Sequence, residues 1–195
     1  MQRGIHHMGF ATFDYERCVD FYTRVLGFEI AWQELQQAED GTVTMRHVFF
    51  DVGGGSYMAF MAPTPESGAP ASWPADLDKA LGLRPYTYHF SLRVDSEQEL
   101  QAWRDRLVEH GVKASAVFNH GWCRSVYFTD PDGLQLEFCY NTRVLSEDDK
   151  ILKPREQPFI DDLRRDPQAA RESSEAMGIP LEAFLGGQEL EEARS

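Results

Sequence analysis

The sequence predicts an α+β protein made of two tandem βαβββ modules and a helical C-terminal arm. Residues 5–30 and 87–114 each alternate apolar and polar residues as a strand does, and then change to the spacing of an amphipathic helix that ends at a glycine. Each half also closes with a glycine-led hairpin, with Gly55 before one final strand and Gly133 before the other. A strand, a helix and a hairpin that occur twice in this order indicate a duplicated module.

The first module opens with a strand followed by a helix. Met8 and Phe10 mark the apolar face of the strand. Asp14 then begins the helix, and Gly27 ends it. The apolar stripe of the helix consists of Val19, Tyr22, Val25 and Leu26. Strand-like runs follow and lead to "GSYMAFM" at residues 55–61, which closes the module.

The second module repeats this order. A strand from Thr87 to Val94 precedes a helix that Asp95 and Ser96 begin and Gly111 ends. The apolar stripe of this helix consists of Leu100, Trp103, Leu107 and Val108. The final strand, "GLQLEFC", completes a second βαβββ unit.

The chain divides into four segments. These are module one at 1–62, a linker at 63–85, module two at 86–145 and an acidic C-terminal extension at 146–195. The linker is rich in Pro, Ala, Gly and Ser, with a short helix expected at 75–81. The extension has helical patterns at 166–178 and 180–187 but few large apolar residues. We therefore expect it to lie along the modules, or along a partner subunit in a homodimer.

Charge and composition exclude several classes of function. The net charge of −13 and the sequence pI of about 4.8 disfavour nucleic acid and anionic membranes, so the expected partner is a small molecule. No signal segment and no run of about 20 apolar residues is seen, which predicts a cytoplasmic protein. The three cysteines, Cys18, Cys123 and Cys139, are scattered, so neither a disulfide framework nor a cysteine zinc site is expected.

Three potential metal ligands fall on one face of the predicted sheets. Alternation turns the apolar side chains toward the helices and leaves His7, His89 and Glu137 on the opposite, concave faces. The two histidines occupy equivalent positions of the repeat. Two imidazoles and one carboxylate form a facial set that suits one divalent metal per chain. The neighbouring His6 is expected on the other face.

The two-module plan resembles the vicinal oxygen chelate superfamily, which includes glyoxalase I, fosfomycin and bleomycin resistance proteins and extradiol ring-cleaving dioxygenases. The resemblance rests on "HHMGF" in the first strand, "DFYTRVLGFE" in the first helix and "DPDGLQLEF" at the end of the second module. It extends from Ile5 to about Tyr140. It implies a cup-shaped, barrel-like mixed sheet with the helices outside.

Ala59 stands in the first module where the second module has Glu137. Glyoxalase-like relatives place a fourth ligand at this position, so the resemblance implies that Ala59 leaves coordination positions open. Open positions on Fe(II) suit the binding of both oxygens of a catechol together with dioxygen. Fe(II) is therefore the favoured metal, while Zn, Ni or Mn also fit the ligand set.

The order His120, six residues, Tyr127 and then Asp-Pro-Asp-Gly closely resembles the extradiol dioxygenase motif. In that motif the tyrosine and the histidine reach the substrate or its oxygenated intermediate, which implies catalytic roles for His120 and Tyr127. Phe118 departs from the motif, which usually has a smaller or polar residue there. No histidine occurs between His47 and His89, where two-domain extradiol enzymes carry their acid–base histidine, so His47 or His120 has to take that role.

These features predict a metal-dependent dioxygenase, an Fe(II) extradiol enzyme acting on a small aromatic diol. The substrate is expected to contact Tyr57, Ala59 and Met61. The alternative is a redox-neutral lyase, isomerase or thiol transferase that uses Zn, Ni, Mn or Mg as a Lewis acid. A metal-free binding protein of the bleomycin-binding kind is disfavoured because it needs no such ligand set.

Overall fold

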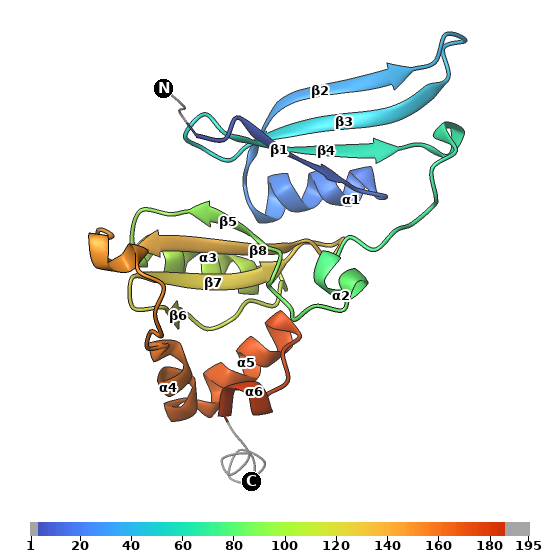
Figure 1. The fold of residues 1–195 in the computed structure, drawn as a ribbon. Helices are drawn as coiled ribbons and strands as arrows, with labels where there is room; N and C mark the ends of the chain where they lie inside the picture. The colour runs from blue at the N-terminus through green and yellow to red at the C-terminus, as the bar shows by residue number, and fades with distance from the viewer. Residues whose placement is uncertain (1–3, 186–195) are drawn as a thin grey trace. The chain divides into compact units, whose positions relative to one another are not determined.

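The computed structural model describes residues 4–185 and divides into two compact units, each with its own four-stranded mixed sheet (Figure 1). Unit 1 contains the residues up to Ala80 together with Asp130–Leu134, and unit 2 contains Leu81–Thr129 and the chain from Gln135 onward. The strand orders are β1-β4-β3-β2 and β5-β8-β7-β6. Because both sheets have the same order and the same parallel first pair, the prediction of two βαβββ modules in an α+β fold is confirmed.

The elements of unit 1 follow the predicted order. They are β1 (His7–Ala11), α1 (Tyr15–Asp20), η1 (Phe21–Val25), β2 (Glu29–Gln37), β3 (Val43–Asp51), β4 (Tyr57–Pro63) and η2 (Pro65–Ser67). In the linker, α2 (Leu77–Leu81) confirms the expected short helix.

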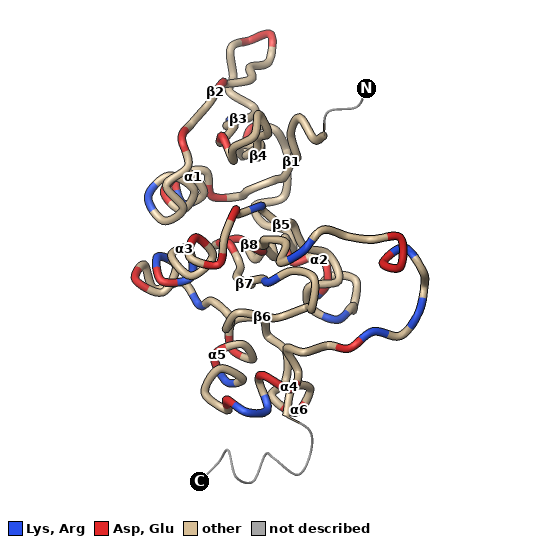
Figure 2. The backbone as a smooth tube through the Cα atoms, turned by 90° about the vertical axis from the view of Figure 1, so that its left-hand side faces the viewer, with Lys and Arg blue, Asp and Glu red and all other residues tan. Residues whose placement is uncertain are grey.

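Unit 2 contains the second module and the arm. Its elements are β5 (Phe90–Arg93), α3 (Glu97–Glu109), β6 (Phe118–Asn119), β7 (Cys123–Thr129), β8 (Gln135–Asn141), η3 (Glu147–Lys150), α4 (Pro158–Arg165), α5 (Pro167–Met177) and α6 (Glu182–Leu185). Acidic positions occur on α3 and along the arm, and in unit 1 on the β2–β3 turn (Figure 2). Within residues 4–185, no helix combines the length and the apolar run that crossing a bilayer requires.

The first helix begins and ends where the sequence predicts, but it changes its winding in between. Asp14 caps α1 by accepting a hydrogen bond from the N–H of Arg17 at 3.1 Å. From Phe21 the chain continues as η1, a π-helical segment in which the N–H of Leu26 donates to the carbonyl of Phe21 at 3.0 Å. Gly27, with φ of 72°, then ends the segment. Apolar spacing alone does not distinguish this wider turn from an α-helical one.

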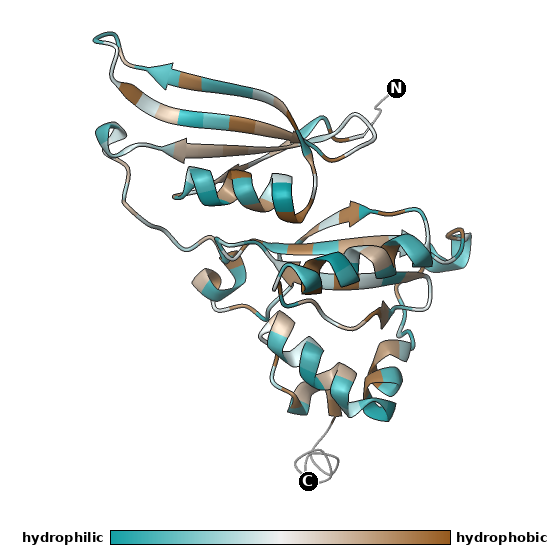
Figure 3. Cartoon of the chain, turned by 180° about the vertical axis from the view of Figure 1, so that it is seen from behind, coloured by the Kyte–Doolittle hydropathy of each residue, from teal (hydrophilic) through white to brown (hydrophobic). Residues whose placement is uncertain are grey.

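The helices cover the apolar faces of the sheets, as alternation predicts. Tyr22 is fully buried, and its ring lies 4.6 Å from that of Phe60 in β4. In unit 2, Trp103 of α3 stacks at 4.6 Å on Phe138 of β8. Both helices carry hydrophilic as well as hydrophobic residues (Figure 3). The opposite faces of the sheets, which carry Glu137 in unit 2, are therefore left for other contacts.

One strand boundary was predicted wrongly. The sequence places a strand from Thr87, whereas β5 begins at Phe90, so His89 lies immediately before the strand. Thr87 instead closes a turn, because its N–H and its hydroxyl both donate to the carbonyl of Arg84, at 3.2 and 2.7 Å. Tyr88, expected on the apolar face, is half exposed. Local hydrogen bonding thus replaces the first positions of the strand pattern.

Asp130, in the turn between β7 and β8, is a buried carboxyl group. Its Oδ1 accepts backbone N–H hydrogen bonds from Asp132 and Leu134 at 2.9 and 2.8 Å, and the Tyr22 hydroxyl donates to its Oδ2 at 3.1 Å. Burial raises the pKa of Asp130 to about 6, although the hydrogen bonds favour its charged form. The group is therefore a source of pH-dependent stability.

We expect Asp130→Asn to remove this pH dependence. Between about pH 4 and 6 the folded protein retains a proton on Asp130 that the unfolded chain releases, so the stability contributed by this group falls as pH rises. The free energy of unfolding of the wild type minus that of the variant should fall by up to about 3 kcal/mol across this window, measured by urea denaturation. Asp40→Asn is a control for which the same difference in unfolding free energy should rise with pH, because backbone and side-chain hydrogen bonds from Thr42 lower the pKa of Asp40. If the difference in unfolding free energy between the wild type and Asp130→Asn rises with pH, the raised pKa of Asp130 is wrong.

The arm packs against the second module within unit 2. Helix α5 confirms the pattern at 166–178, with Asp166 as its N-cap and Gly178 in the left-handed conformation after its end. The buried Ser173 accepts a hydrogen bond from the N–H of Ala116 at 3.1 Å. Helix α6 occupies part of the predicted segment 180–187, whose last two positions lie outside the described residues, and α4 was not anticipated.

Candidate active site

Two of the three predicted metal ligands meet in unit 2. Nε2 of His89 lies 3.0 Å from Oε2 of Glu137. Glu137 is in the middle of β8, between Ser91 of β5 and Tyr127 of β7, and is 5% exposed. Burial raises the pKa of Glu137, but the hydrogen bond from His89 and further polar contacts outweigh it and bring the pKa below its usual value. Glu137 is therefore a charged carboxylate held beside an imidazole.

The third predicted ligand, His7, lies in β1 of unit 1. Its Nδ1 is 2.9 Å from Nδ1 of His6, and its ring centroid is 5.4 Å from that of Phe49. Within either unit, the described residues include no group of three or more His, Cys, Asp or Glu side chains placed to hold a metal ion. The adjacent imidazole nitrogen and carboxylate oxygen of His89 and Glu137 nevertheless fit a divalent metal, since both are usual donors for such ions.

The two predicted catalytic residues are hydrogen-bonded to each other. Nε2 of His120 lies 2.9 Å from the hydroxyl oxygen of Tyr127. The β6–β7 hairpin brings them together, because the N–H of His120 donates to the carbonyl of Cys123 at 3.0 Å. Burial lowers the pKa of His120 and raises that of Tyr127. At neutral pH the pair therefore consists of a neutral imidazole and a protonated phenol, which can share one proton.

His89, His120 and Tyr127 line one cavity of about 230 Å³ within unit 2. Arg84 and Thr87 add further polar side chains to its lining, and Tyr86 and Phe118 supply aromatic walls. The ring of Tyr127 lies 4.9 Å from that of Tyr86 and 5.4 Å from that of Phe118. An apolar pocket with a few convergent polar groups is the usual form of a small-molecule site.

Tyr86 is a site residue that the sequence did not indicate. Its φ of 63° is the only positive value at a non-glycine residue among residues 4–185. Its N–H donates to the side-chain oxygen of Gln135, which is buried in β8. This hydrogen bond offsets a backbone conformation that is unfavourable for a tyrosine, and such strain is typical of functional sites. A tyrosine after a proline carries no sequence signal for this conformation.

The predicted substrate contacts lie in unit 1. Ala59 of β4 pairs with Gly9 of β1 and Phe49 of β3, and it is buried. Met61 follows on the same face, and Tyr57 lines a separate cavity of about 350 Å³ together with His6 and other residues. Ala59 thus occupies in its sheet the position that Glu137 occupies in the sheet of unit 2, so the repeat alignment of these two residues agrees with the strand register.

Unit 1 contains two further histidines, His6 immediately before β1 and His47 in β3. His6 precedes β1, so alternation does not apply to it, and its ring lies 5.7 Å from that of Tyr57. Nδ1 of His47 is 3.4 Å from Glu34, whereas its buried Nε2 has no hydrogen-bond partner within the described part of the chain. His47 and His120 therefore belong to different units, and it is His120 that is paired with Tyr127.

Comparisons with known proteins agree with this architecture. The family model described as the Glyoxalase/Bleomycin resistance protein/Dioxygenase superfamily matches residues 4–138. MhqA of Bacillus subtilis (strain 168), named as a putative ring-cleaving dioxygenase, is 26% identical over 136 residues, which are 68% of this chain and 39% of that protein. The chain therefore spans well under half of that relative.

Solved structures show the same fold. A glyoxylase/bleomycin resistance protein/dioxygenase domain from Frankia sp. EAN1pec is 18% identical with a TM-score of 0.56, and the match covers 72% of this chain and 99% of that one. The fosfomycin resistance protein FosX from Mesorhizobium loti is 22% identical with a TM-score of 0.50, covering 76% of this chain and 98% of that one.

Proposed function

The chain belongs to the glyoxalase/bleomycin resistance protein/dioxygenase superfamily, and on this premise we propose that it is a non-haem Fe(II) dioxygenase that cleaves a small aromatic diol in the extradiol manner. The observation that carries the proposal is the cavity in which His89 meets the hydrogen-bonded pair of His120 and Tyr127. The similarity to MhqA, which is named for ring cleavage, supports the same reaction class.

His89 and Glu137 are the residues of unit 2 that would hold the metal, and the assignment of His7 as the third ligand stays a prediction from the sequence. Fe(II) held by two imidazoles and one carboxylate would supply exchangeable positions for the two oxygens of a vicinal diol and for dioxygen. Ala59 brings no further donor to this set, since it carries only a methyl group.

His120 and Tyr127 handle the protons of the reaction. In the tautomer in which Nε2–H of His120 donates to the oxygen of Tyr127, the neutral imidazole is suited to accept a proton from a diol hydroxyl at Nδ1, and the Tyr127 proton is not used within the pair. The phenol of Tyr127 stays protonated, so it can donate a hydrogen bond to an oxygen of the substrate. Tyr86 and Phe118 hold the ring by aromatic contacts and exclude water from it.

An oxygen-uptake assay tests this function. Protein loaded with Fe(II) should consume dioxygen in the presence of a catechol and form a coloured ring-opened product. Protein loaded with Zn is the control and should consume none, because Zn²⁺ has no redox chemistry. Failure of the Fe(II) protein across a panel of catechols, combined with anaerobic turnover supported by Zn, Ni or Mn, would replace the proposal with a redox-neutral lyase, isomerase or thiol transferase.

A further inference from the structure

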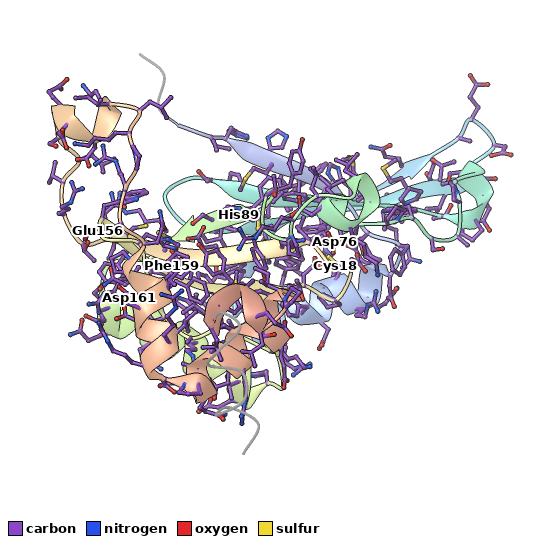
Figure 4. The ribbon with its side chains drawn as sticks, turned by 60° about the horizontal axis from the view of Figure 1, so that its bottom comes forward. Cys18, Asp76, His89, Glu156, Phe159 and Asp161 are labelled. Carbon is purple, nitrogen blue, oxygen red and sulfur yellow. The ribbon has the colours of Figure 1, made fainter. Side chains whose placement is uncertain are left out.

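The arm supplies one wall of the cavity that contains His89, His120 and Tyr127. Four residues after the second module line it, namely Phe159, Met177, Ile179 and Phe184. Phe159 lies on α4, Met177 ends α5, and Phe184 lies on α6. His89 and Phe159, both labelled in Figure 4, therefore line the same cavity although 70 residues of sequence separate them.

Phe118 is the residue of the module on which this wall is built. The ring of Phe159 stacks on it at 4.9 Å with an interplanar angle of 13°, and Phe184 meets it edge-on at 5.9 Å. The ring of Phe159 also lies 5.2 Å from that of His120. The large side chain at position 118, which departs from the extradiol motif, thus joins the catalytic hairpin to the arm.

The wall is held firmly in place. Glu172 of α5 accepts a charged hydrogen bond from Arg104 of α3 at 2.6 Å, with both side chains partly buried. Arg104 also donates to the carbonyl of Ser115 at 3.0 Å. Ala170 and Ser173 of α5 are fully buried. Because these contacts tie α5 to α3 and to the second module, the arm residues that line the cavity are held against the module.

The arm lies outside the part of the chain that the family shares. The family model ends at residue 138. The Frankia domain is matched over 99% of its length while covering 72% of this chain, so a matched solved structure accounts for the modules without needing the arm. The wall is therefore an addition to the superfamily fold, placed where it touches the cavity.

The volume and the polarity of the cavity limit the size and the substituents of the ligand that it can bind. An apolar cavity of about 150 Å³ holds benzene, so a cavity of about 230 Å³ has room for one ring with a short substituent. The arm contributes two phenylalanines, a methionine and an isoleucine, which carry no charge to pair with a polar substituent. Among the lining residues, Arg84 carries a charge, and it is exposed.

We propose that the C-terminal arm determines substrate specificity, and that the substrate is a monocyclic diol whose ring carries a short apolar substituent directed at Phe159 and Phe184. This inference rests on the proposed dioxygenase function for the identity of the diol. The arm itself selects by apolar contact and shape, which does not depend on the reaction.

Specificity constants for a set of diols test the proposal. The full-length Fe(II) protein is assayed with catechol, 4-methylcatechol, 4-tert-butylcatechol and 3,4-dihydroxybenzoate. Wild type should prefer 4-methylcatechol. Phe159→Ala enlarges the cavity and should raise the ratio of kcat/KM for the tert-butyl compound over the methyl compound at least about tenfold, as expected for a few methylene groups in an apolar pocket. Phe159→Leu provides a conservative variant that keeps an apolar side chain on Phe118 if the alanine variant folds poorly.

Leu163→Ala is the matched control for a structural role. Leu163 is also a buried residue of α4, but it does not line the cavity. It should lower the melting temperature without changing the order of preference among the diols. A preference for 3,4-dihydroxybenzoate, or equal shifts in preference for Phe159 and Leu163 variants, would overturn the inference.

A binding measurement separates this inference from the proposed reaction. Metal-free protein is titrated calorimetrically with 4-methylphenol, 4-tert-butylphenol and 4-hydroxybenzoate. If no diol is cleaved but Phe159→Ala shifts binding toward the tert-butyl compound, the role of the arm in specificity is supported and the dioxygenase function is rejected. If diols are cleaved but replacing Phe159 changes neither the substrate preference nor the binding, the dioxygenase function is supported and the role of the arm in specificity is rejected.

Discussion

Replacing His89 by alanine is expected to abolish stoichiometric binding of a divalent metal, and with it all turnover. Loss of even an outer-shell partner of a metal ligand weakens affinity by about 10-fold to 100-fold, so loss of a direct ligand should exceed about 100-fold. Glu137→Gln should have the same effect while avoiding a cavity, since the amide has nearly the shape of the carboxylate. Metal content after dialysis, measured by mass spectrometry, gives the result directly.

His110→Ala is the matched control for this series. Nδ1 of His110 lies 2.9 Å from the carbonyl of Arg106 at the end of α3, away from the residues that line the cavity. This variant should keep full metal content. Circular dichroism should show a native fold for all variants, because β8 is paired along its length with β7 and also pairs with β5.

His7→Ala extends the same experiment to unit 1. If His7 is the third ligand, its variant should lose metal as completely as the His89 variant does. Retention of metal by the His7 variant alone would require another third ligand in the chain. Full occupancy in the His7, His89 and Glu137 variants would eliminate the proposed metal site.

Tyr127→Phe is expected to slow turnover by about 100-fold while leaving the metal content unchanged. The substitution keeps the aromatic contacts with Tyr86 and Phe118 but removes the hydroxyl that bonds to His120 at 2.9 Å. An acid–base or hydrogen-bonding group that acts in the transition state contributes about 10²-fold to 10⁴-fold. The loss should appear in kcat, with a small change in KM, because ring binding is preserved.

Tyr22→Phe supplies the control for loss of a buried phenol. The Tyr22 hydroxyl donates to Asp130 in unit 1, so this variant should change stability and leave kcat unaltered. A double-mutant cycle with His120→Asn tests the pairing: if His120 and Tyr127 act as a unit, the effects of the two substitutions should not multiply. If the factors by which the two substitutions lower kcat do multiply, His120 and Tyr127 act in separate steps.

Local sequence patterns were sufficient to predict the module plan and, for most strand and helix residues, whether the side chain faces the core. Period-two and helical spacing are local properties, and each buried position depends mainly on which face of its own element it occupies. The alternation that separates Phe138 from Glu137 therefore held in the structure. The repeat alignment of Ala59 with Glu137 also agreed with the strand register, since both sheets are built in the same order.

The assembly of the candidate site depends on contacts between segments that are distant in the sequence. His89 lies before its strand, in a segment shaped by a turn, yet its imidazole reaches Glu137. Tyr86 adopts a left-handed conformation that is supported by the hydrogen bond its N–H donates to Gln135, 49 positions away. Neither feature follows from the spacing of neighbouring residues, because each depends on a partner from a distant strand.

The position of the arm is the feature that the sequence predicted least, because it depends on contacts between distant segments. Its composition indicated an extension without its own core, and α5 has the helix start and end that Asp166 and Gly178 predict. The stacking of Phe159 on Phe118 could not be read from either segment, since a phenylalanine in a short helix has no signal for its partner. Local patterns specify which side chain is apolar, while contacts between distant segments are chosen by the packing of the whole unit.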